Sequence, residues 1–422
     1  MGHRGRGPRP PRGRVAGDPL LPHFRAPAPA GPLLDGLFLP GLGAAGPGCA
    51  RPGRLRIRGQ TLCGLLGKPR RLGVGRPAFL LRLGLAPAGQ GGAGSSRRVG
   101  RREVEETKSI ISPMRALIVG ATGLLGHALY RHLLVRPGWE AVVTTYDIVA
   151  PGFEKLDAMD ASAVESLLDR VRPEAVIFPA SNPFVDFCEQ HPEETRRLNV
   201  DATLRTAEAA QKRGARFVFF STDYVFDGKK GSPYREEDEP LPLSEYGRQK
   251  LEVERALAAA GGRWTVVRTA AIFGWELQPK NFILQVLARL RSGQKLKAAS
   301  DLDYTPTYAP SLAEGVVGLV EKDAQGVFHL AGPETVSRAE FARAAAAVFG
   351  LDASHIEEVP FAAFAGQGAG RPQHSALDSG KAERLLGRPL LGARAALKAM
   401  KAAAQEWEDY SGKLLSGQGG RP

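Results

Sequence analysis

The sequence from Met114 onward predicts an α/β protein: a doubly wound parallel sheet followed by a smaller C-terminal lobe. Two observations predict this class. Short apolar runs such as RALIVG, EAVIFPAS and RFVFFST alternate with longer helical patterns such as LLGHALYRHLLV. Runs that are apolar at every position are typical of strands buried on both faces, and the helices between them supply right-handed crossovers.

The alternation also sets the expected domain bounds. It is regular over residues 114–274, which we expect to form the sheet domain. It loosens afterwards into helices such as NFILQVLARLRSG with one clear strand, GVFHLAG. Residues 275–410 are therefore expected to be mainly the smaller lobe, lying over the carboxyl edge of the sheet, and residues 411–422 a flexible tail.

Residues 1–113 differ from the rest in composition. The chain of 422 residues carries a net charge of +13, but residues 1–100 hold 17 Lys and Arg against two acidic residues, whereas residues 101–422 hold 40 against 42. Gly, Pro and Arg interrupt the apolar runs of this extension, which predicts disorder because too little apolar surface can be buried. Three interpretations compete: an anion-binding tail, a targeting peptide, and translated sequence upstream of the true start. Met114, which opens the first strand, favours the last.

The body of the chain excludes several classes of partner. Its near-neutral charge argues against nucleic acid, and it has no apolar run of about eighteen residues that would predict a membrane span. Cys49 and Cys63 lie in the extension, which leaves Cys188 alone in the body, too few for a disulfide framework or a zinc site. We therefore expect a cytoplasmic protein without a bound metal. His127 and His132, on the first helix, are expected to be partly exposed.

The segment GATGLLG predicts a dinucleotide site because it follows the first strand and opens the first helix. Gly120 permits a tight turn, Gly123 lets the backbone approach a pyrophosphate, and Gly126 lets the helix pack closely. The amides and dipole of the helix N-terminus favour the anion. A merely structural turn is the alternative. The residues of this turn expected to bind the cofactor are Gly120, Thr122, Gly123, Leu124, Leu125 and Gly126.

Later strand ends extend the predicted cofactor site. Asp147 ends the second strand, where a carboxylate can bond the adenosine ribose hydroxyls, although a solvated turn residue is the alternative. No Arg or Lys follows it directly, which modestly favours NADH over NADPH. Asp157, after a short third strand, is expected either to accept from the adenine amino group or to cap the next helix. Ala180 and Ser181, at the end of the fourth strand, are expected to lie beside the cofactor.

A hydroxyl pair and a Tyr–Lys pair predict the catalytic group. Ser221 and Thr222 end the fifth strand at the carboxyl edge of the sheet, where ligands bind in such folds. Tyr246 and Lys250 are spaced i and i+4, which places both on one face of a helix. A lysine ammonium beside a phenol lowers the pKa of the phenol, so Tyr246 becomes a usable acid or base, and Thr222 can bond the same oxygen. A solvated helix face is the alternative for the Tyr–Lys pair alone.

Together these segments resemble an extended short-chain dehydrogenase/reductase of the dTDP-4-dehydrorhamnose reductase group, which has a Rossmann-type fold. The matching segments, in consistent order from residue 114 to about 405, are GATGLLG, STDYVFDG, SPYREEDEPLPLSEYGRQK, VVRTAAIFG, NF at 281–282, PT at 306–307, FHLAG and RPQHSALD. The resemblance implies that Thr222, Tyr246 and Lys250 are a catalytic triad, with Lys250 also holding the nicotinamide ribose. It implies hydride transfer from NADH or NADPH to the C4 carbonyl of a nucleotide-linked 6-deoxyhexose. The residues expected to contact that substrate are Ser221, Thr222, Asn281 and Arg371, the last with a structural salt bridge as its alternative.

The sequence departs from the reductase pattern where the sugar would bind. Ala271 stands where those enzymes usually carry tryptophan, and Leu302 and Tyr304 replace glutamine and glycine. PYREED and RPQHSALD also resemble the regulatory β subunit of methionine adenosyltransferase. Two function classes therefore stay open, a nucleotide-sugar reductase and a cofactor-binding regulatory subunit, with an epimerase or dehydratase of the same superfamily as a third. A nucleotide sugar is the expected partner, and assembly as a homodimer stays open.

Overall fold

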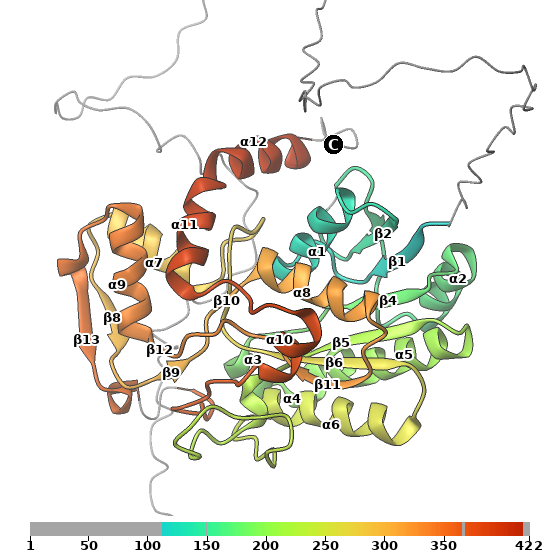
Figure 1. Cartoon of the computed structure of the whole chain (residues 1–422), viewed down its shortest axis with the longest axis horizontal. Coiled ribbons are helices and arrows are strands. Elements are labelled where there is room, and N and C mark those ends of the chain that lie inside the picture. Colours follow the sequence, from blue (N-terminus) through green and yellow to red (C-terminus); the bar gives the residue numbers. More distant parts are fainter. Residues whose placement is uncertain (1–111, 149, 365–367, 417–422) are drawn as a thin grey trace, which may run out of the picture. The chain divides into compact units, whose positions relative to one another are not determined.

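The computed structural model describes residues 112–148, 150–364 and 368–416, and the predictions for residues 1–111 lie outside them. The main element is a seven-stranded parallel sheet in the order β11-β6-β5-β4-β1-β2-β3 (Figure 1). The strand order reverses between β1 and β4, where doubly wound sheets open a crevice for ligands beyond their carboxyl ends. The strands are β1 (Met114–Ile118), β2 (Trp139–Thr145), β3 (Glu154–Lys155), β4 (Ala175–Phe178), β5 (Arg216–Thr222), β6 (Trp264–Thr269) and β11 (Gly326–His329).

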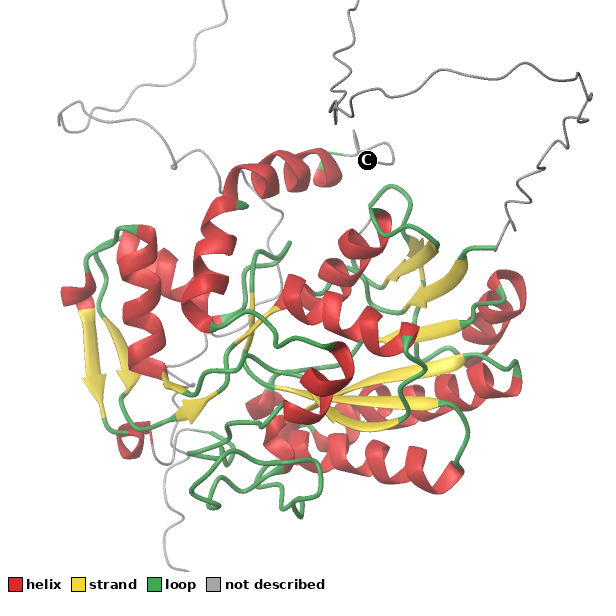
Figure 2. Ribbon diagram, viewed as in Figure 1, coloured by secondary structure: helices red, strands yellow, loops and turns green. Residues whose placement is uncertain are grey.

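Helices cover both faces of this sheet (Figure 2). Alternate residues of a strand point to opposite faces, so Val218 and Phe220 of β5 pack with α1 and α8, whereas Phe217 and Phe219 pack with α2, α5 and α6. The predicted doubly wound α/β fold is confirmed. The helices around the sheet are α1 (Leu124–Leu134), α2 (Ala161–Val171), α3 (Val185–Gln190), α4 (Pro192–Arg196), the π-helix η1 (Arg197–Ala202), α5 (Thr203–Lys212), the 3-10 turn η2 (Asp223–Val225), α6 (Glu245–Ala260), α8 (Ala309–Glu321) and α10 (Gly380–Leu386).

A second core belongs to the smaller lobe, on the left of Figure 1, where three helices pack against a two-stranded sheet. Phe341 and Leu287 are among its buried residues. The elements of the lobe and of its connections are β7 (Ile272–Phe273), α7 (Phe282–Arg291), β8 (Leu296–Ala299), β9 (Asp303–Tyr304), β10 (Thr307–Tyr308), β12 (Val336–Ser337), α9 (Arg338–Phe349), η3 (Ala353–His355), β13 (Ile356–Val359), η4 (Phe361–Phe364) and α11 (Ala393–Ala402).

The boundary expected at residue 274 does not hold for α8, β11 and α10, since Ala382 of α10 also packs in the core of the sheet domain. β11 pairs in parallel with β6 at the edge of the main sheet, and Leu312 and Val316 of α8 pack in the same core as Leu129 of α1. Residues 309–329 and α10 therefore belong to the sheet domain. The apolar run GVFHLAG predicts a strand but not its neighbour, because the pairing partner is decided by contacts distant in sequence.

The flexible tail expected from residue 411 is a helix as far as Leu415, so that prediction was wrong for 411–415. α12 (Ala404–Leu415) buries Trp407 and Leu414. Arg131 of α1 forms an ion pair with Glu406, and its guanidinium carbon lies 4.9 Å from the centroid of the Tyr410 ring. These aromatic and ionic contacts with α1 order the segment.

His127 is also different from expectation, since it is buried, with only 1% of its surface exposed. Its ring centroid lies 5.3 Å from that of Tyr410, 5.4 Å from that of Trp407 and 6.4 Å from that of Phe153. Burial, helped by the positive charge of Arg131, lowers the pKa of His127 to about 4. The imidazole is therefore neutral at pH 7.

We expect this histidine to make the fold sensitive to acid. Between pH 6.5, the ordinary pKa, and about 4, the unfolded chain takes up a proton at His127 that the folded protein does not, so stability falls as the pH is lowered through this window. A pKa difference of this size corresponds to about 3 kcal/mol. Replacing His127 with Phe keeps a ring in the aromatic cage and should reduce the acid-induced loss, measured by urea denaturation at about pH 7 and about pH 5. Equal losses in wild type and variant would contradict this.

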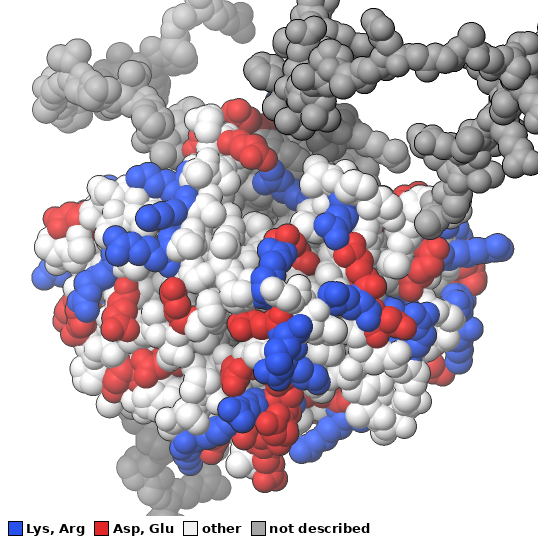
Figure 3. Space-filling view, in the orientation of Figure 1, with Lys and Arg blue, Asp and Glu red and all other residues white. Residues whose placement is uncertain are grey.

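Acidic and basic side chains are mixed over the surface that Figure 3 shows. Several form ion pairs, such as Arg136 with Glu321 at 2.7 Å. Among the described residues, no helix has both the length and the apolar character needed to cross a bilayer. Nor, within those same ranges, do three or more His, Cys, Asp or Glu residues gather where they could hold a metal ion.

Candidate active site

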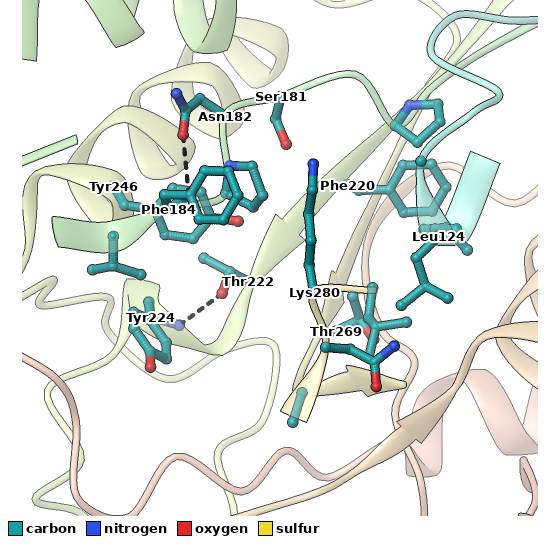
Figure 4. Close-up of a pocket in the computed structure, with 18 of the residues that line it drawn as sticks. Leu124, Ser181, Asn182, Phe184, Phe220, Thr222, Tyr224, Tyr246, Thr269 and Lys280 are labelled. Carbon is teal, nitrogen blue, oxygen red and sulfur yellow. Dashed lines mark hydrogen bonds between the residues drawn. The ribbon is translucent and has the colours of Figure 1, made fainter. Parts of the chain in front are cut away.

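A cavity of about 640 Å³ opens at the carboxyl ends of the central strands, where the strand order of the sheet reverses. Its walls are the glycine-rich turn before α1, the loop after β4, the end of β5, the first turns of α6 and the loop before α7 (Figure 4). Asp147, Asp157 and Ala180 do not line it. The predicted site residues that do are Gly120, Thr122, Gly123, Leu124, Leu125, Gly126, Ser181, Ser221, Thr222, Tyr246, Lys250, Asn281 and Arg371.

The glycine-rich turn has the close approaches that its sequence predicts. Gly120 has a φ of +92°, and a Cβ there would lie 3.0 Å from the Cβ of Ala180. Ala180 therefore packs behind the turn and does not face the cavity. A Cβ on Gly126 would lie 2.2 Å from the Gly120 carbonyl oxygen, so only glycine lets α1 start this close to the turn. This compact cradle at a helix N-terminus suits a pyrophosphate.

We expect Gly126→Ala to open the cradle. The added methyl group must push α1 away from the turn, which should weaken dinucleotide binding and lower the free energy of unfolding by about 1–3 kcal/mol. Gly412→Ala in α12 is the matched control, because a Cβ there meets nothing within 4 Å and alanine favours a helix. Titration of NADH against both variants, with urea denaturation, measures the two effects. A Gly126→Ala protein that binds NADH like wild type would contradict this role of the turn.

Two buried hydroxyls face the cavity without a protein partner. The Oγ of Ser221 and the Oγ1 of Thr269 lie at the ends of neighbouring strands β5 and β6, and neither has a hydrogen-bond partner among the described residues. Both residues line the cavity. Because burying an unpaired hydroxyl is unfavourable, these two atoms suit a polar ligand lying across the strand ends. A dinucleotide with a hydroxyl-rich ribose fits both this feature and the glycine cradle.

Thr222, Tyr246 and Lys250 come together at one wall of the cavity, where the Nζ of Lys250 lies 5.7 Å from the centroid of the Tyr246 ring. Ser244 caps the N-terminus of α6 by accepting from the Gly247 amide at 3.3 Å. A Cβ on Gly247 would lie 2.2 Å from the Tyr224 carbonyl oxygen, so this glycine lets α6 approach the end of β5 closely. The sequence prediction that these three side chains share one site agrees with this geometry.

The predicted lowering of the Tyr246 pKa by Lys250 is wrong. Burial raises the pKa of Tyr246 well above its ordinary value, and the nearby Cys188 and Asp223 raise it further. Lys250 is buried, its Nζ donates to the Phe220 carbonyl oxygen at 2.9 Å, and burial lowers its own pKa to about 8. The phenol of Tyr246 therefore holds its proton at neutral pH, which suits a proton donor.

Asp223 is a site residue that the sequence prediction missed. It is buried at the cavity wall, accepts from the Thr222 hydroxyl at 3.0 Å, and accepts from the Ser375 hydroxyl at 2.5 Å. Burial raises its pKa to about 6. Its position in STDYVFDG, directly after the strand-end hydroxyl pair, was the available signal. Asp223 fixes the orientation of the Thr222 hydroxyl.

Asn199 is a second residue that was missed. It lies in the π-helix η1, fully buried, where its Nδ2 donates to the Gln249 Oε1 at 2.9 Å and its Oδ1 accepts from the Asn182 amide at 2.7 Å. It thus joins α6, which carries Tyr246, to the loop after β4, which also lines the cavity. No local sequence signal marks this bond, because the π-helix depends on tertiary contacts.

The two acidic residues predicted to bind the cofactor, Asp147 and Asp157, lie outside the cavity lining and have different hydrogen-bond partners. Asp147 is exposed at the end of β2 and accepts from Gln278 at 3.3 Å. Asp157 accepts from the Met159 amide at 2.8 Å in a local turn, and the cap of α2 is Asp160, which accepts from the Ala163 amide. The capping alternative for Asp157 is therefore wrong.

The two predicted substrate contacts from the lobe have structural partners. Asn281 caps α7 by accepting from the Leu284 amide, and its amide donates to the Gly274 carbonyl at 2.9 Å. Arg371 donates to the Asp186 carboxylate at 2.7 Å, as its alternative interpretation required. Both residues line the cavity.

A side cavity of about 210 Å³ adjoins the main one where the sequence departs from the reductase pattern. Ala271, with a φ of +41°, lies on both cavities. Leu302 and Tyr304 line the side cavity together with Phe282 and Phe341, and Asp223 and Arg338 add charged groups to it. The replacements noted in the sequence therefore meet at one place beside Thr222 and Asp223.

Comparison with known proteins gives relatives of two kinds. The chain is 33% identical over 294 residues to methionine adenosyltransferase 2 subunit beta from Bos taurus, covering 67% of this chain and 86% of that protein. It is 32% identical over 305 residues to the probable low-salt glycan biosynthesis reductase Agl14 from Haloferax volcanii, covering 71% of this chain and 100% of that protein.

A solved structure is similar over the same part of the chain. The dTDP-4-dehydrorhamnose reductase of Bacillus anthracis, in complex with NADP, superposes with a TM-score of 0.62 at 25% identity, covering 69% of this chain and 100% of that structure. The family model of the RmlD substrate binding domain matches residues 114–406, which is most of the described chain. The protein therefore belongs to the RmlD substrate binding domain family.

Proposed function

We propose that this protein is an NAD(P)H-dependent reductase of the 4-keto group of a nucleotide-linked deoxysugar, acting in nucleotide-sugar biosynthesis of the dTDP-rhamnose type. The observation that carries the proposal is the convergence of Thr222, Tyr246 and Lys250 on the cavity that also holds the glycine-rich cradle. The relationship to the Agl14 reductase and to the reductase from Bacillus anthracis supports an oxidoreductase.

The cofactor would lie across the strand ends. The turn at Gly120, Gly123 and Gly126 would hold its pyrophosphate, and the hydroxyls of Ser221 and Thr269 would bond its polar groups. A reduced nicotinamide bound there would supply the hydride. Asp147, without a basic neighbour in sequence, supports a modest preference for NADH.

Tyr246 would donate its phenolic proton to the carbonyl oxygen of the sugar as that oxygen becomes an alkoxide. Because the pKa of Tyr246 is raised, the phenol is protonated at neutral pH and its proton is available when negative charge develops on the substrate oxygen. Thr222 donates its hydroxyl proton to Asp223 in this structure, and it would hold the same oxygen once that proton turns from Asp223 toward the substrate. Lys250 would stabilise the tyrosinate left behind, since its Nζ lies 5.7 Å from the centroid of the Tyr246 ring.

A regulatory subunit that binds a dinucleotide is the second candidate. It is favoured by the 33% identity to methionine adenosyltransferase 2 subunit beta and by the altered side cavity around Ala271. Both candidates would bind a dinucleotide in the same cavity, but only the reductase would also bind and reduce a sugar.

A panel of nucleotide-linked 4-keto sugars, each with NADH and with NADPH, tests the proposal. Oxidation of the nicotinamide is followed by its absorbance. We expect at least one 4-keto-6-deoxyhexose nucleotide to be reduced. If dinucleotide binds but no sugar in the panel is reduced, the regulatory alternative is the better account.

A further inference from the structure

The loop between β7 and α7, residues 274–281, forms one wall of the main cavity and is called the bridging loop here. Its alternate residues Glu276, Gln278 and Lys280 all line the cavity, and Figure 4 shows the Lys280 side chain extending into it. The loop comes from the smaller lobe, whereas the cradle at Gly120 belongs to the sheet domain. It therefore lies where it can contact a ligand held by the cradle.

The bridging loop is fixed at both ends. The Trp275 indole donates to the Met400 carbonyl oxygen at 2.7 Å. The Glu276 carboxylate accepts from the amides of Lys280 and Asn281 at 2.6 and 2.7 Å, which closes the loop on itself. A Cβ on Gly274 would lie 3.5 Å from the Leu124 side chain, so the base of the loop lies against the start of α1. The position of the middle of the loop is thus set by the fold.

The middle of the bridging loop reaches the end of β2. The Nε2 of Gln278 donates to the Oδ2 of Asp147 at 3.3 Å. Gln278 lines the cavity and Asp147 does not, so the amide lies between the carboxylate and the ligand space. Asp147 forms no ion pair in the part of the chain that the structure describes.

We propose that Gln278 is a cofactor-selectivity residue that acts together with Asp147 on the adenosine half of the dinucleotide. The inference rests on the proposed use of a nicotinamide cofactor. With Nε2 engaged by Asp147, the Oε1 of Gln278 is left to accept from a ribose hydroxyl. A 2′-phosphate carries a charge of about −1.5 to −2 and has no hydroxyl proton to donate. It would therefore be repelled by the Asp147 carboxylate and could not donate to the Oε1 of Gln278. This pair selects NAD(H) against NADP(H).

Equilibrium titrations of NADH and NADPH, followed by nicotinamide fluorescence, test the proposal. Wild type should bind NADH more tightly. Gln278→Lys neutralises Asp147 and offers a cation to the phosphate, so it should shift the ratio of the two dissociation constants by about tenfold toward NADPH. Gln278→Ala should weaken NADH several-fold. Gln294→Ala, an exposed glutamine after α7, is the matched control and should change neither affinity.

Ligands that correspond to one half of the dinucleotide show which half Gln278 contacts. Gln278→Ala should weaken AMP as it weakens NADH and leave nicotinamide mononucleotide unchanged. Tight binding of both dinucleotides with an unchanged ratio in Gln278→Lys would overturn the selectivity role, while the proposed function would stand. Absence of binding of either dinucleotide to wild type would overturn both. Unchanged thermal unfolding of the variants shows that the comparison concerns folded protein.

Discussion

Replacing Tyr246 with phenylalanine is expected to lower turnover by at least about a hundredfold, while the dissociation constant for NADH changes little. General acid catalysis is typically worth about a hundredfold to ten-thousandfold, and the substitution removes only the hydroxyl that would donate the proton. The ring keeps its place, including its edge-to-face contact with Tyr224 at 6.3 Å between centroids. Steady-state kinetics with the best sugar of the panel, together with NADH titration, measure both quantities.

Tyr410→Phe is the matched control. Tyr410 lies in α12 against Arg131 and His127, outside the cavity, so removal of its hydroxyl should leave turnover unchanged. If Tyr246→Phe kept wild-type turnover, Tyr246 would not be the proton donor. If it lost NADH binding in proportion to turnover, its role would be in holding the cofactor.

The second large effect is expected from a buried ion pair between β6 and α6, the helix that carries Tyr246. Arg268 of β6 donates from Nε and NH2 to the Glu254 carboxylate at 3.0 and 2.6 Å, and both side chains are at most 5% exposed. Its NH1 lies 3.3 Å from the Nε2 of His329. Arg268→Met leaves the Glu254 carboxylate buried without its charged partner, which should lower the free energy of unfolding by about 3–5 kcal/mol.

The double variant Arg268→Met/Glu254→Leu shows whether the loss of stability comes from the unpaired Glu254 carboxylate or from the absence of the ion pair itself. Replacing both charges with apolar groups removes the unpaired carboxylate, so most of the stability should return. Urea denaturation of wild type, single and double variants measures this. A double variant as unstable as the single one would mean that the packing of Arg268 on the Phe226 ring, 5.1 Å away, is the larger contribution.

Features that depend on neighbouring residues in sequence were predictable. The glycine spacing of GATGLLG predicted the turn and the close start of α1, and the i and i+4 spacing of Tyr246 and Lys250 placed both on the same wall of the cavity. The apolar runs predicted the parallel strands, because burial on both faces leaves no polar alternation.

Features that depend on distant contacts were not predictable. β11 pairs with β6 although elements of the smaller lobe lie between the two strands in the sequence. The hydrogen bond between Asn199 and Gln249 joins residues 50 positions apart. The pKa of Tyr246 was predicted in the wrong direction, because the spacing reveals the neighbouring Lys250 but not the burial that raises the pKa of the phenol. The reach of Gln278 to Asp147 also has no local signal, since it crosses from the lobe to the sheet domain.

The most direct test of the reductase account is isotope transfer. Wild-type protein is incubated with NADH deuterated at C4 of the nicotinamide and with a nucleotide-linked 4-keto-6-deoxyhexose, and the product sugar is analysed by mass spectrometry and NMR. With the hydride-donating position labelled, the account predicts one deuterium at C4 of the sugar, formed at a rate that falls in Tyr246→Phe. Tight binding of the labelled cofactor without any labelled sugar, from protein that forms a stable complex with a methionine adenosyltransferase catalytic subunit, would contradict it.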